Sequence, residues 1–260
     1  MSLASRVEQS TAFRRTARAG YAVSGLLHVL IGIIALSTAF GVAGRADQTG
    51  ALRAIASVPA GFVLLWAMVV ALLALALWRV ANGFTVHETD LRKRWTRRLS
   101  EWGQAIGYLA IALLAAGVAV DGRAGGGAEA ITAQLLAVPG GVVLIVAVGL
   151  AVLGGGIWFI VKGVLRRFLT DLKTPPTRVR PAIEAFGVFG HVAKGLALAV
   201  LGILIVVAAV TADPQRAGGL DQAFSALATL PFGAVLIGLV GVGFIAYGVY
   251  CGFRTRFANL

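Results

Sequence analysis

Four residues could carry chemistry inside the long apolar segments of this sequence: Tyr21, His28, His191 and Lys194. Ionisable side chains are costly to place in hydrocarbon, so they often mark a solute pathway or a ligand site. One hypothesis is therefore a pathway or ligand site formed by these residues. In the structural alternative, the histidines hydrogen-bond between helices, Lys194 extends its ammonium group toward the headgroups, and Tyr21 anchors a membrane interface.

Two histidines on different membrane helices could also ligate haem b. In the repeat alignment described below, His28 and His191 differ by seven positions, which is roughly 10 Å of depth along a helix. Two axial ligands of one haem need nearly equal depth, so a shared bis-histidine site is disfavoured. We expect no cofactor, with haem held by a single histidine as the alternative.

Catalytic motifs are missing from the sequence. It contains no G-x-S-x-G, no H-E-x-x-H, no phosphate-binding loop and no cluster of cysteine and histidine, and Cys251 is its single cysteine. These are the arrangements that nucleophilic catalysis, zinc chemistry and nucleotide binding require. We therefore expect no enzymatic activity and no metal site.

The composition predicts the elements that must position these residues. Hydrophobic residues make up 58% of the 260 residues and charged residues 13%, whereas a soluble domain carries about 25% charged residues. Each of six apolar runs is close to the roughly 20 residues that a membrane-spanning helix needs. We therefore predict an all-α polytopic membrane protein with segments near 20–40, 62–78, 103–120, 142–161, 186–210 and 232–253.

The distribution of the positive charges predicts an orientation. Of the 23 Lys and Arg residues, 18 lie on one side of the predicted segments, 4 lie on the other, and Lys194 is within a segment. Cytoplasmic loops of membrane proteins carry the excess of Lys and Arg. We therefore expect a multi-pass protein of the bacterial cytoplasmic (inner) membrane with both termini in the cytoplasm.

A short motif occurs three times, as VPAGFVLL, VPGGVVLI and LPFGAVLI. Proline suits the first position of a helix, so each proline is predicted to begin an even-numbered segment, with a glycine two residues later for close packing. An aromatic residue follows each proline by 19 positions and is predicted at the opposite interface. The motif residues are Pro59, Gly61, Pro139, Gly141, Pro231 and Gly233.

The repeated motif divides the chain into three tandem helical hairpins. All three have the same orientation, which predicts a pseudo-threefold arrangement about the membrane normal. The predicted divisions are an N-terminal cytoplasmic segment 1–16, repeat 1 at 17–84, a basic connector 85–101, repeat 2 at 102–164, a second basic connector with prolines at 165–182, repeat 3 at 183–253, and a C-terminus at 254–260.

These features resemble the domain of unknown function 1206 family. The resemblance rests on the opening from Gly20-Tyr21 to Gly25, on the P-x-G-x-[LV]-L motif and on the three hairpins, and it covers about 17–253. The family consists of bacterial integral membrane proteins built from tandem two-helix repeats. The resemblance implies the architecture and carries no established activity.

The stretch LRKRWTRRLSEW at 91–102 combines a basic cluster with tryptophan. This composition fits contact with anionic lipid headgroups, and the residues expected to make that contact are Arg92, Lys93, Arg94, Trp95, Arg97 and Arg98. A role in keeping this connector on the cytoplasmic side of the membrane would by itself explain the charges.

We expect a non-enzymatic scaffold or accessory subunit of a membrane complex that also binds lipid. The alternatives are a small-solute channel or carrier along the pseudo-threefold axis, and a haem-binding redox subunit. The expected partners are membrane lipids, anionic ones in particular, together with another membrane protein or a second copy of the chain. No recognition motif for nucleic acid is present.

Overall fold

The computed structural model describes residues 11–41, 46–86, 88–121, 128–173, 176–217 and 219–258, and these residues form helices and turns with no strand. Leu172 and Ala258 form one isolated antiparallel bridge. The predicted all-α class is confirmed. In chain order the helices are α2 (Thr11–Ala39), α3 (Gln48–Ala56), α4 (Gly61–Thr85), α5 (Leu91–Asp121), α6 (Ala128–Leu136), α7 (Gly141–Val164), η1 (Arg167–Asp171), α8 (Arg180–Thr211), η2 (Pro214–Ala217), α9 (Leu220–Ala228) and α10 (Gly233–Phe257).

Six of these helices are long and apolar enough to cross a membrane: α2, α4, α5, α7, α8 and α10. The predicted multi-pass architecture is therefore confirmed. Several helices extend beyond the apolar runs, because Lys and Arg are good helix formers. The basic stretch 91–102 lies in the first turns of α5, so most of the segment assigned to the first connector is helical. The end of α4, the start of α5, η1 and the end of α10 lie on one side of the protein. We call this side the basic side.

The repeated prolines lie two residues before α4, α7 and α10, so their predicted place at the first helical position is corrected. In the first repeat the residue after Pro59, Ala60, has a left-handed backbone with φ 65°. The amide of Gly61 then donates to the carbonyl of Val58 at 2.9 Å. Positive φ after a proline is typical of a type II turn. The turn recurs with left-handed Gly140 and Phe232 and with bonds from Gly141 to Val138 and from Gly233 to Leu230.

The glycine that ends each turn is required by a close approach. A Cβ on Gly233 would lie 2.5 Å from the carbonyl oxygen of Ala228 in α9. Gly61 and Gly141 face carbonyls of α3 and α6 in the same way. The repeated motif is thus a tight corner between a short helix and a long one.

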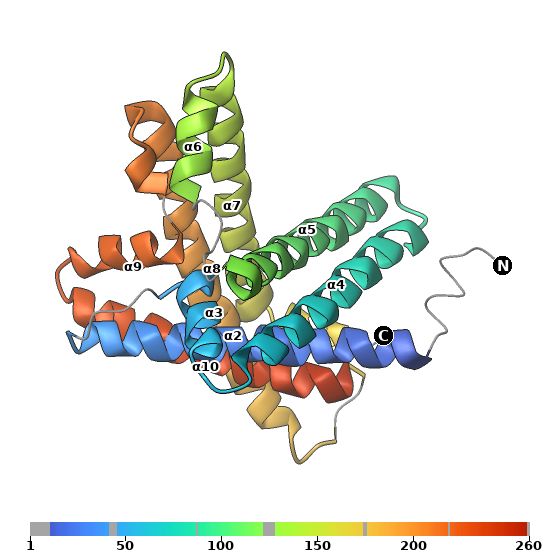
Figure 1. Cartoon of the computed structure of the whole chain (residues 1–260). Helices are drawn as coiled ribbons and strands as arrows, with labels where there is room; N and C mark the ends of the chain where they lie inside the picture. Colours follow the sequence, from blue (N-terminus) through green and yellow to red (C-terminus); the bar gives the residue numbers. More distant parts are fainter. Residues whose placement is uncertain are drawn as a thin grey trace.

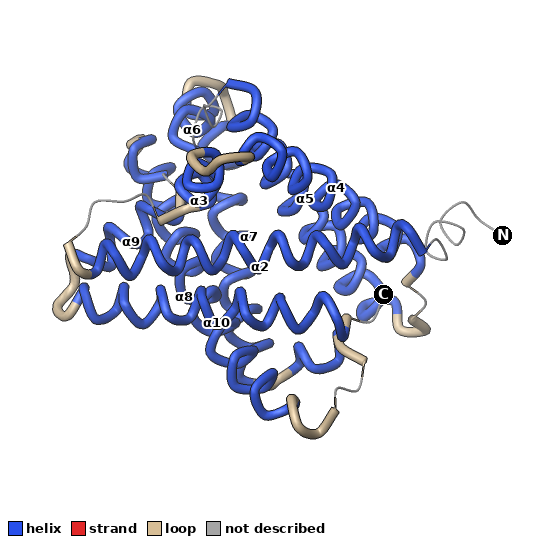
Figure 2. Tube along the Cα trace, turned by 60° about the horizontal axis from the view of Figure 1, so that its bottom comes forward, coloured by secondary structure: helices blue, strands red, loops and turns tan. Residues whose placement is uncertain are grey.

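The long helices pack as three pairs, α2 with α10, α4 with α5, and α7 with α8. Figure 1 shows the pairs crossing one another, and Figure 2 shows α2 running alongside α10. In the α4–α5 and α7–α8 pairs, the second long helix of one repeat packs against the first long helix of the next repeat. In the α2–α10 pair, the first long helix of the first repeat packs against the second long helix of the last repeat. The contacts α2–α4 and α8–α10 link the pairs. Within the described residues α5 and α7 share no interface of comparable extent, so the threefold relation is approximate.

Facing glycines bring two of the pairs into backbone contact. A Cβ on Gly32 in α2 would lie 2.5 Å from the carbonyl oxygen of Gly241 in α10. A Cβ on Gly195 in α8 would lie 2.6 Å from the carbonyl oxygen of Gly156 in α7. Membrane helices associate through such small residues. Gly156 therefore packs closely, whereas its neighbour Gly155 faces open space.

The third pair lacks most of these glycines. The α4 positions that correspond by the repeat to Gly241 and Gly248 are Val69 and Ala76. At these positions α4 carries buried side chains in place of glycine. An apolar groove lies between the two helices.

Candidate functional site

The candidate site is a polar cluster buried at the basic side between α2, α4 and α10. Its central residues are Tyr21, Arg79 and Arg254, which are 2%, 6% and 5% exposed. All three lie on helices that are long enough to span a membrane. Buried cations in such helices are costly and are commonly functional.

The hydroxyl of Tyr21 accepts hydrogen bonds from both arginines. The Nη2 atom of Arg79 lies 2.6 Å from this oxygen, and the Nη2 atom of Arg254 lies 3.3 Å from it. The guanidinium carbon of Arg254 is also 4.3 Å from the centre of the Tyr21 ring, which adds a cation–π contact. Two positive groups therefore converge on one phenol oxygen.

Two carboxylates border this cluster. Glu101 in α5 pairs with Nη1 of Arg79 at 2.8 Å. Asp171 in η1 pairs with Lys162 of α7 at 2.6 Å and lies 3.9 Å from Arg254. Burial by itself raises the pKa of Asp171, but Lys162 and Arg254 outweigh it, so the pKa of this carboxyl lies below its usual value. The two carboxylates pair with these cations and compensate part of the positive charge.

A second cluster surrounds Tyr247 of α10. Lys194 places Nζ 4.3 Å from the centre of this ring. The rings of His28 and His191 lie 4.7 and 5.1 Å from it, centre to centre. Three of the four residues predicted from the sequence therefore meet at one tyrosine.

Each histidine is bonded within its own helix. The Nδ1 atom of His28 lies 2.6 Å from the carbonyl oxygen of Ser24, and that of His191 lies 2.7 Å from the carbonyl oxygen of Gly187. A carbonyl oxygen can only accept, so Nδ1 carries the proton in both rings. His191 also stacks on Phe168 with a centroid distance of 4.9 Å. Whether these histidines line a pathway or ligate a cofactor stays a prediction.

Tyr250 connects the two clusters. Its ring lies 4.9 Å from that of His191 and 6.0 Å from the guanidinium of Arg254. Its hydroxyl donates to the carbonyl of Phe168 at 3.3 Å. Tyr21, the fourth predicted residue, thus belongs to the same polar core through Arg254.

Sequence reasoning missed Arg79, Lys162 and Arg254 as core residues, because it counted them among the 18 positive charges on one side of the predicted segments. A usable signal was present in the repeats. Lys162 and Arg254 each lie 23 residues after the repeated proline, at equivalent positions. Tyr247 carried no such signal, because an aromatic residue in an apolar helix is ordinary.

The residues predicted to contact anionic lipid form the first two turns of α5. Arg97 pairs with Glu88 at 2.8 Å, and Trp95 is half exposed beneath Arg98. The Nε atoms of Arg94 and Arg98 have no hydrogen-bond partner among the described residues. Arg92 and Lys93 are exposed.

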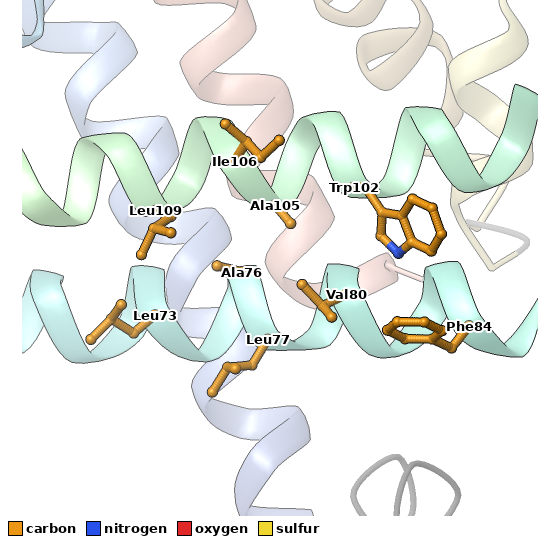
Figure 3. Close-up of a pocket in the computed structure, with 9 residues that line it drawn as sticks. All are labelled: Leu73, Ala76, Leu77, Val80, Phe84, Trp102, Ala105, Ile106 and Leu109. Carbon is orange, nitrogen blue, oxygen red and sulfur yellow. The ribbon is translucent and has the colours of Figure 1, made fainter.

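The apolar groove between α4 and α5 begins directly after this basic turn. It has a volume of about 440 Å³, and Figure 3 shows Trp102 reaching from α5 toward Phe84 of α4. Arg94 and Arg98 precede Trp102 by eight and four residues, so they lie on the same helix face as the groove. The lining residues are Leu73, Ala76, Leu77, Val80, Phe84, Trp102, Ala105, Ile106 and Leu109.

The polar core can bind and orient an anion through its cations and hydroxyls. The described residues contain no group of three or more His, Cys, Asp or Glu side chains placed to hold a metal ion. Covalent catalysis needs a nucleophile held by a general base that a third group orients. The two histidines, each bonded to a backbone carbonyl of its own helix, do not form such an arrangement with a carboxylate in the described part of the chain.

Comparisons with known proteins agree with the repeat architecture. The family described as Domain of Unknown Function (DUF1206) matches three segments, residues 19–86, 102–166 and 189–258. An uncharacterized protein of Bacillus subtilis (strain 168), YxxB, is 29% identical over 254 residues, which cover 95% of this chain and 92% of the relative. No solved structure matches the chain.

Proposed function

The chain belongs to the DUF1206 family, whose function is unknown, and from this premise we propose that it is a non-enzymatic scaffold or accessory subunit of the bacterial inner membrane that binds anionic lipid. The observation that carries the proposal is the groove between α4 and α5, which continues into a basic helical turn. The apolar groove matches the acyl chains of an anionic phospholipid, and the cations at its end match the phosphate headgroup.

The groove supplies the apolar part of the site. Its lining is entirely apolar apart from the indole nitrogen of Trp102, and it lies on helices that are long enough to span the membrane. An acyl chain that fills it would cover surface that two helices leave uncovered. Contacts of this kind favour a bound lipid over a freely exchanging one, because the chain gains close packing on two sides.

The basic turn supplies the headgroup part. Arg94 and Arg98 lie two turns and one turn before Trp102 on the groove face, and their Nε atoms have no partner among the described residues. Each Lys or Arg near an anionic membrane surface contributes about 1 kcal/mol of attraction. Arginine also pairs with phosphate oxygens in a planar, two-point geometry.

The scaffold role is supported by a second face of α5. Gly103 and Gly107 are exposed and form a G-x-x-x-G spacing, and a Cβ on either would meet nothing within 4 Å among the described residues. This spacing permits close approach of another membrane helix. A partner subunit or a second copy of the chain could pack on this face.

Native mass spectrometry tests the lipid proposal. The purified protein should retain phosphatidylglycerol or cardiolipin in preference to phosphatidylethanolamine. The double variant Arg94→Gln/Arg98→Gln should lose this preference, and Leu77→Trp, which fills the groove from an exposed position, should reduce total lipid retention.

The matched control is Arg92→Gln/Arg97→Gln, which removes the same charge from residues off the groove face. It should retain lipid like the parent protein. Equal losses of anionic lipid in the two double variants would show that general electrostatic attraction, and not the groove face, selects the lipid. A protein that retains no anionic lipid would contradict the proposal.

The polar core supports a second candidate, a small-solute carrier. Charged and aromatic residues extend from Glu101 at the basic side to His28, and apolar side chains such as Phe244 and Ile237 lie beyond. A solute would need a conformational change to pass through this buried core. Anion flux in proteoliposomes, compared between the parent and Lys194→Met, tests this candidate.

Haem binding stays the third candidate, through Nε2 of His28 or His191. A visible absorption spectrum of the purified protein tests it, because a histidine-ligated haem gives a Soret band. A colourless preparation after growth with a haem precursor would end this candidate.

A further inference from the structure

We propose that Arg254, Tyr21 and Arg79 form a binding site for one oxyanion, a phosphate or carboxylate group, at the basic side of α2, α4 and α10. The site shares no residue with the groove between α4 and α5, so it does not rest on the proposed lipid function. The fold buries hydrogen-bond donors here and leaves several of them without acceptors among the described residues.

Arg254 is the least satisfied of these groups. A guanidinium has five N–H donors and no acceptor. Arg254 is 5% exposed, yet its one hydrogen bond to a described residue is the 3.3 Å contact with Tyr21, and its nearest carboxylate there, Asp171, lies 3.9 Å away. Its Nε atom has no partner in the same part of the chain. Buried guanidinium groups normally pair with a carboxylate or phosphate at shorter distances.

Arg79 differs because it already has a carboxylate. Its Nη1 atom contacts Glu101 at 2.8 Å, and its Nη2 atom contacts Tyr21 at 2.6 Å. Its Nε atom is nevertheless buried without a partner among the residues that the structure describes. Arg79 therefore holds Tyr21 in place and adds positive charge beside Arg254.

Tyr21 has a proton to donate. Its hydroxyl accepts from both arginines, which occupies the two acceptor positions of a phenol. The O–H of Tyr21 is a further donor, and no described residue accepts a hydrogen bond from it. An oxyanion beside Arg254 would accept this proton and the free guanidinium donors together.

The charge of the surrounding core also favours an anion. Arg79, Lys162, Lys194 and Arg254 are cationic, whereas Glu101 and Asp171 are the carboxylates paired with them. Lys194 contacts aromatic rings and has no carboxylate partner in the described part of the chain. Four cations and two carboxylates leave an excess of positive charge that a bound anion would neutralise.

Two partly exposed carboxylates border the site on the basic side. The side chains of Glu101 and Asp171 are 18% and 31% exposed, and they lie at the edge of the cluster. A phosphate group could therefore come from a lipid of the adjacent leaflet or from solution.

Thermal unfolding of the purified full-length protein in detergent tests the inference. Inorganic phosphate should raise the melting temperature in a saturable way, compared with sodium chloride at the same ionic strength. A short-chain phosphatidic acid, compared with its phosphatidylcholine analogue, tests the lipid source. Stabilisation by either phosphate compound supports the site and names its source, whereas stabilisation by neither overturns it.

Three variants assign the effect to these residues. Arg254→Gln should abolish the stabilisation, and Arg256→Gln, an equal charge change at an exposed position two residues away, should leave it unchanged. Tyr21→Phe keeps the ring and should weaken binding by at least about tenfold, because it removes a donor to a charged group. If Arg254→Gln does not fold, the Tyr21→Phe result decides: unchanged anion affinity in that variant would overturn the inference.

Discussion

Gly25 of α2 and Gly248 of α10 face each other so closely that a Cβ on Gly25 would lie 2.8 Å from the carbonyl oxygen of Gly248, and a Cβ on Gly248 would lie 2.6 Å from that of Gly25. This contact joins the first long helix of the chain to the last. It also holds Tyr21 and Arg254, which lie one to two turns nearer the basic side, against each other.

Gly248→Ala is expected to destabilise the protein. The added methyl group must push α2 and α10 apart, and overpacking of this kind costs about 1–3 kcal/mol. Gly252→Ala is the matched control, because a Cβ on Gly252 would meet nothing within 4 Å among the described residues. Thermal unfolding in detergent should show a lower melting temperature for Gly248→Ala alone. Equal melting temperatures of the two variants would show that the glycine contact does not limit packing.

Ala60→Gly is expected to stabilise the protein. Ala60 has φ 65°, a left-handed conformation that costs roughly 1–2 kcal/mol for a residue with a Cβ. Glycine removes this strain but loses more entropy on folding, so we expect a net gain of about 0.5–1 kcal/mol. Ala60→Val should have the opposite effect, and a melting temperature that falls in the glycine variant would contradict the turn geometry.

Arg79 and Glu101 are expected to show a large coupling energy. Their ion pair at 2.8 Å is mostly buried, so removing one partner leaves the other without compensation. A double-mutant cycle with Arg79→Met and Glu101→Gln should give about 1–3 kcal/mol. The exposed pair Arg97–Glu88 is the control and should give roughly 0–1 kcal/mol. Similar coupling energies for the two pairs would argue against a buried core at Arg79.

Asp171 is expected to make stability depend on pH in the acidic range. Its pKa in the folded protein is lowered by Lys162 and Arg254, against the effect of burial. The unfolded state therefore binds this proton more readily, and the stabilisation is present above the unfolded pKa of about 3.9. It is lost as the pH falls through the folded pKa.

Melting temperatures of the parent and Asp171→Asn, measured from about pH 7 to pH 3, test this dependence. The parent should be the more stable protein near pH 7, and the difference should shrink below about pH 4. A difference that stays constant over this range would exclude ionised Asp171 as its source.

Much of the fold could be predicted, because its signals are local. Six apolar runs and three copies of one motif indicated the long helices and the tandem repeats. Tyr21, His28, His191 and Lys194 were visible as candidates, since a polar residue stands out in an apolar run. The helix starts were predicted two residues too early, at the prolines, because the left-handed residue after each proline is set by the fit of the short helix against the long one.

Other parts of the site depend on contacts between distant segments. The repeats suggested hairpins, but the closest packing joins α10 to α2 and α7 to α8, where glycines of different repeats meet. Arg79 and Arg254 were counted among the positive charges outside the predicted segments, and only their convergence on Tyr21 shows them to be core residues.

The sequence by itself determined the membrane helices and their repeats, because hydrophobic length and turn residues act along the chain. The tertiary structure decided which helix faces meet, which charges are buried and which donors lack acceptors among the described residues. Those properties arise from packing between residues as distant as Tyr21 and Arg254, and no local pattern encodes them.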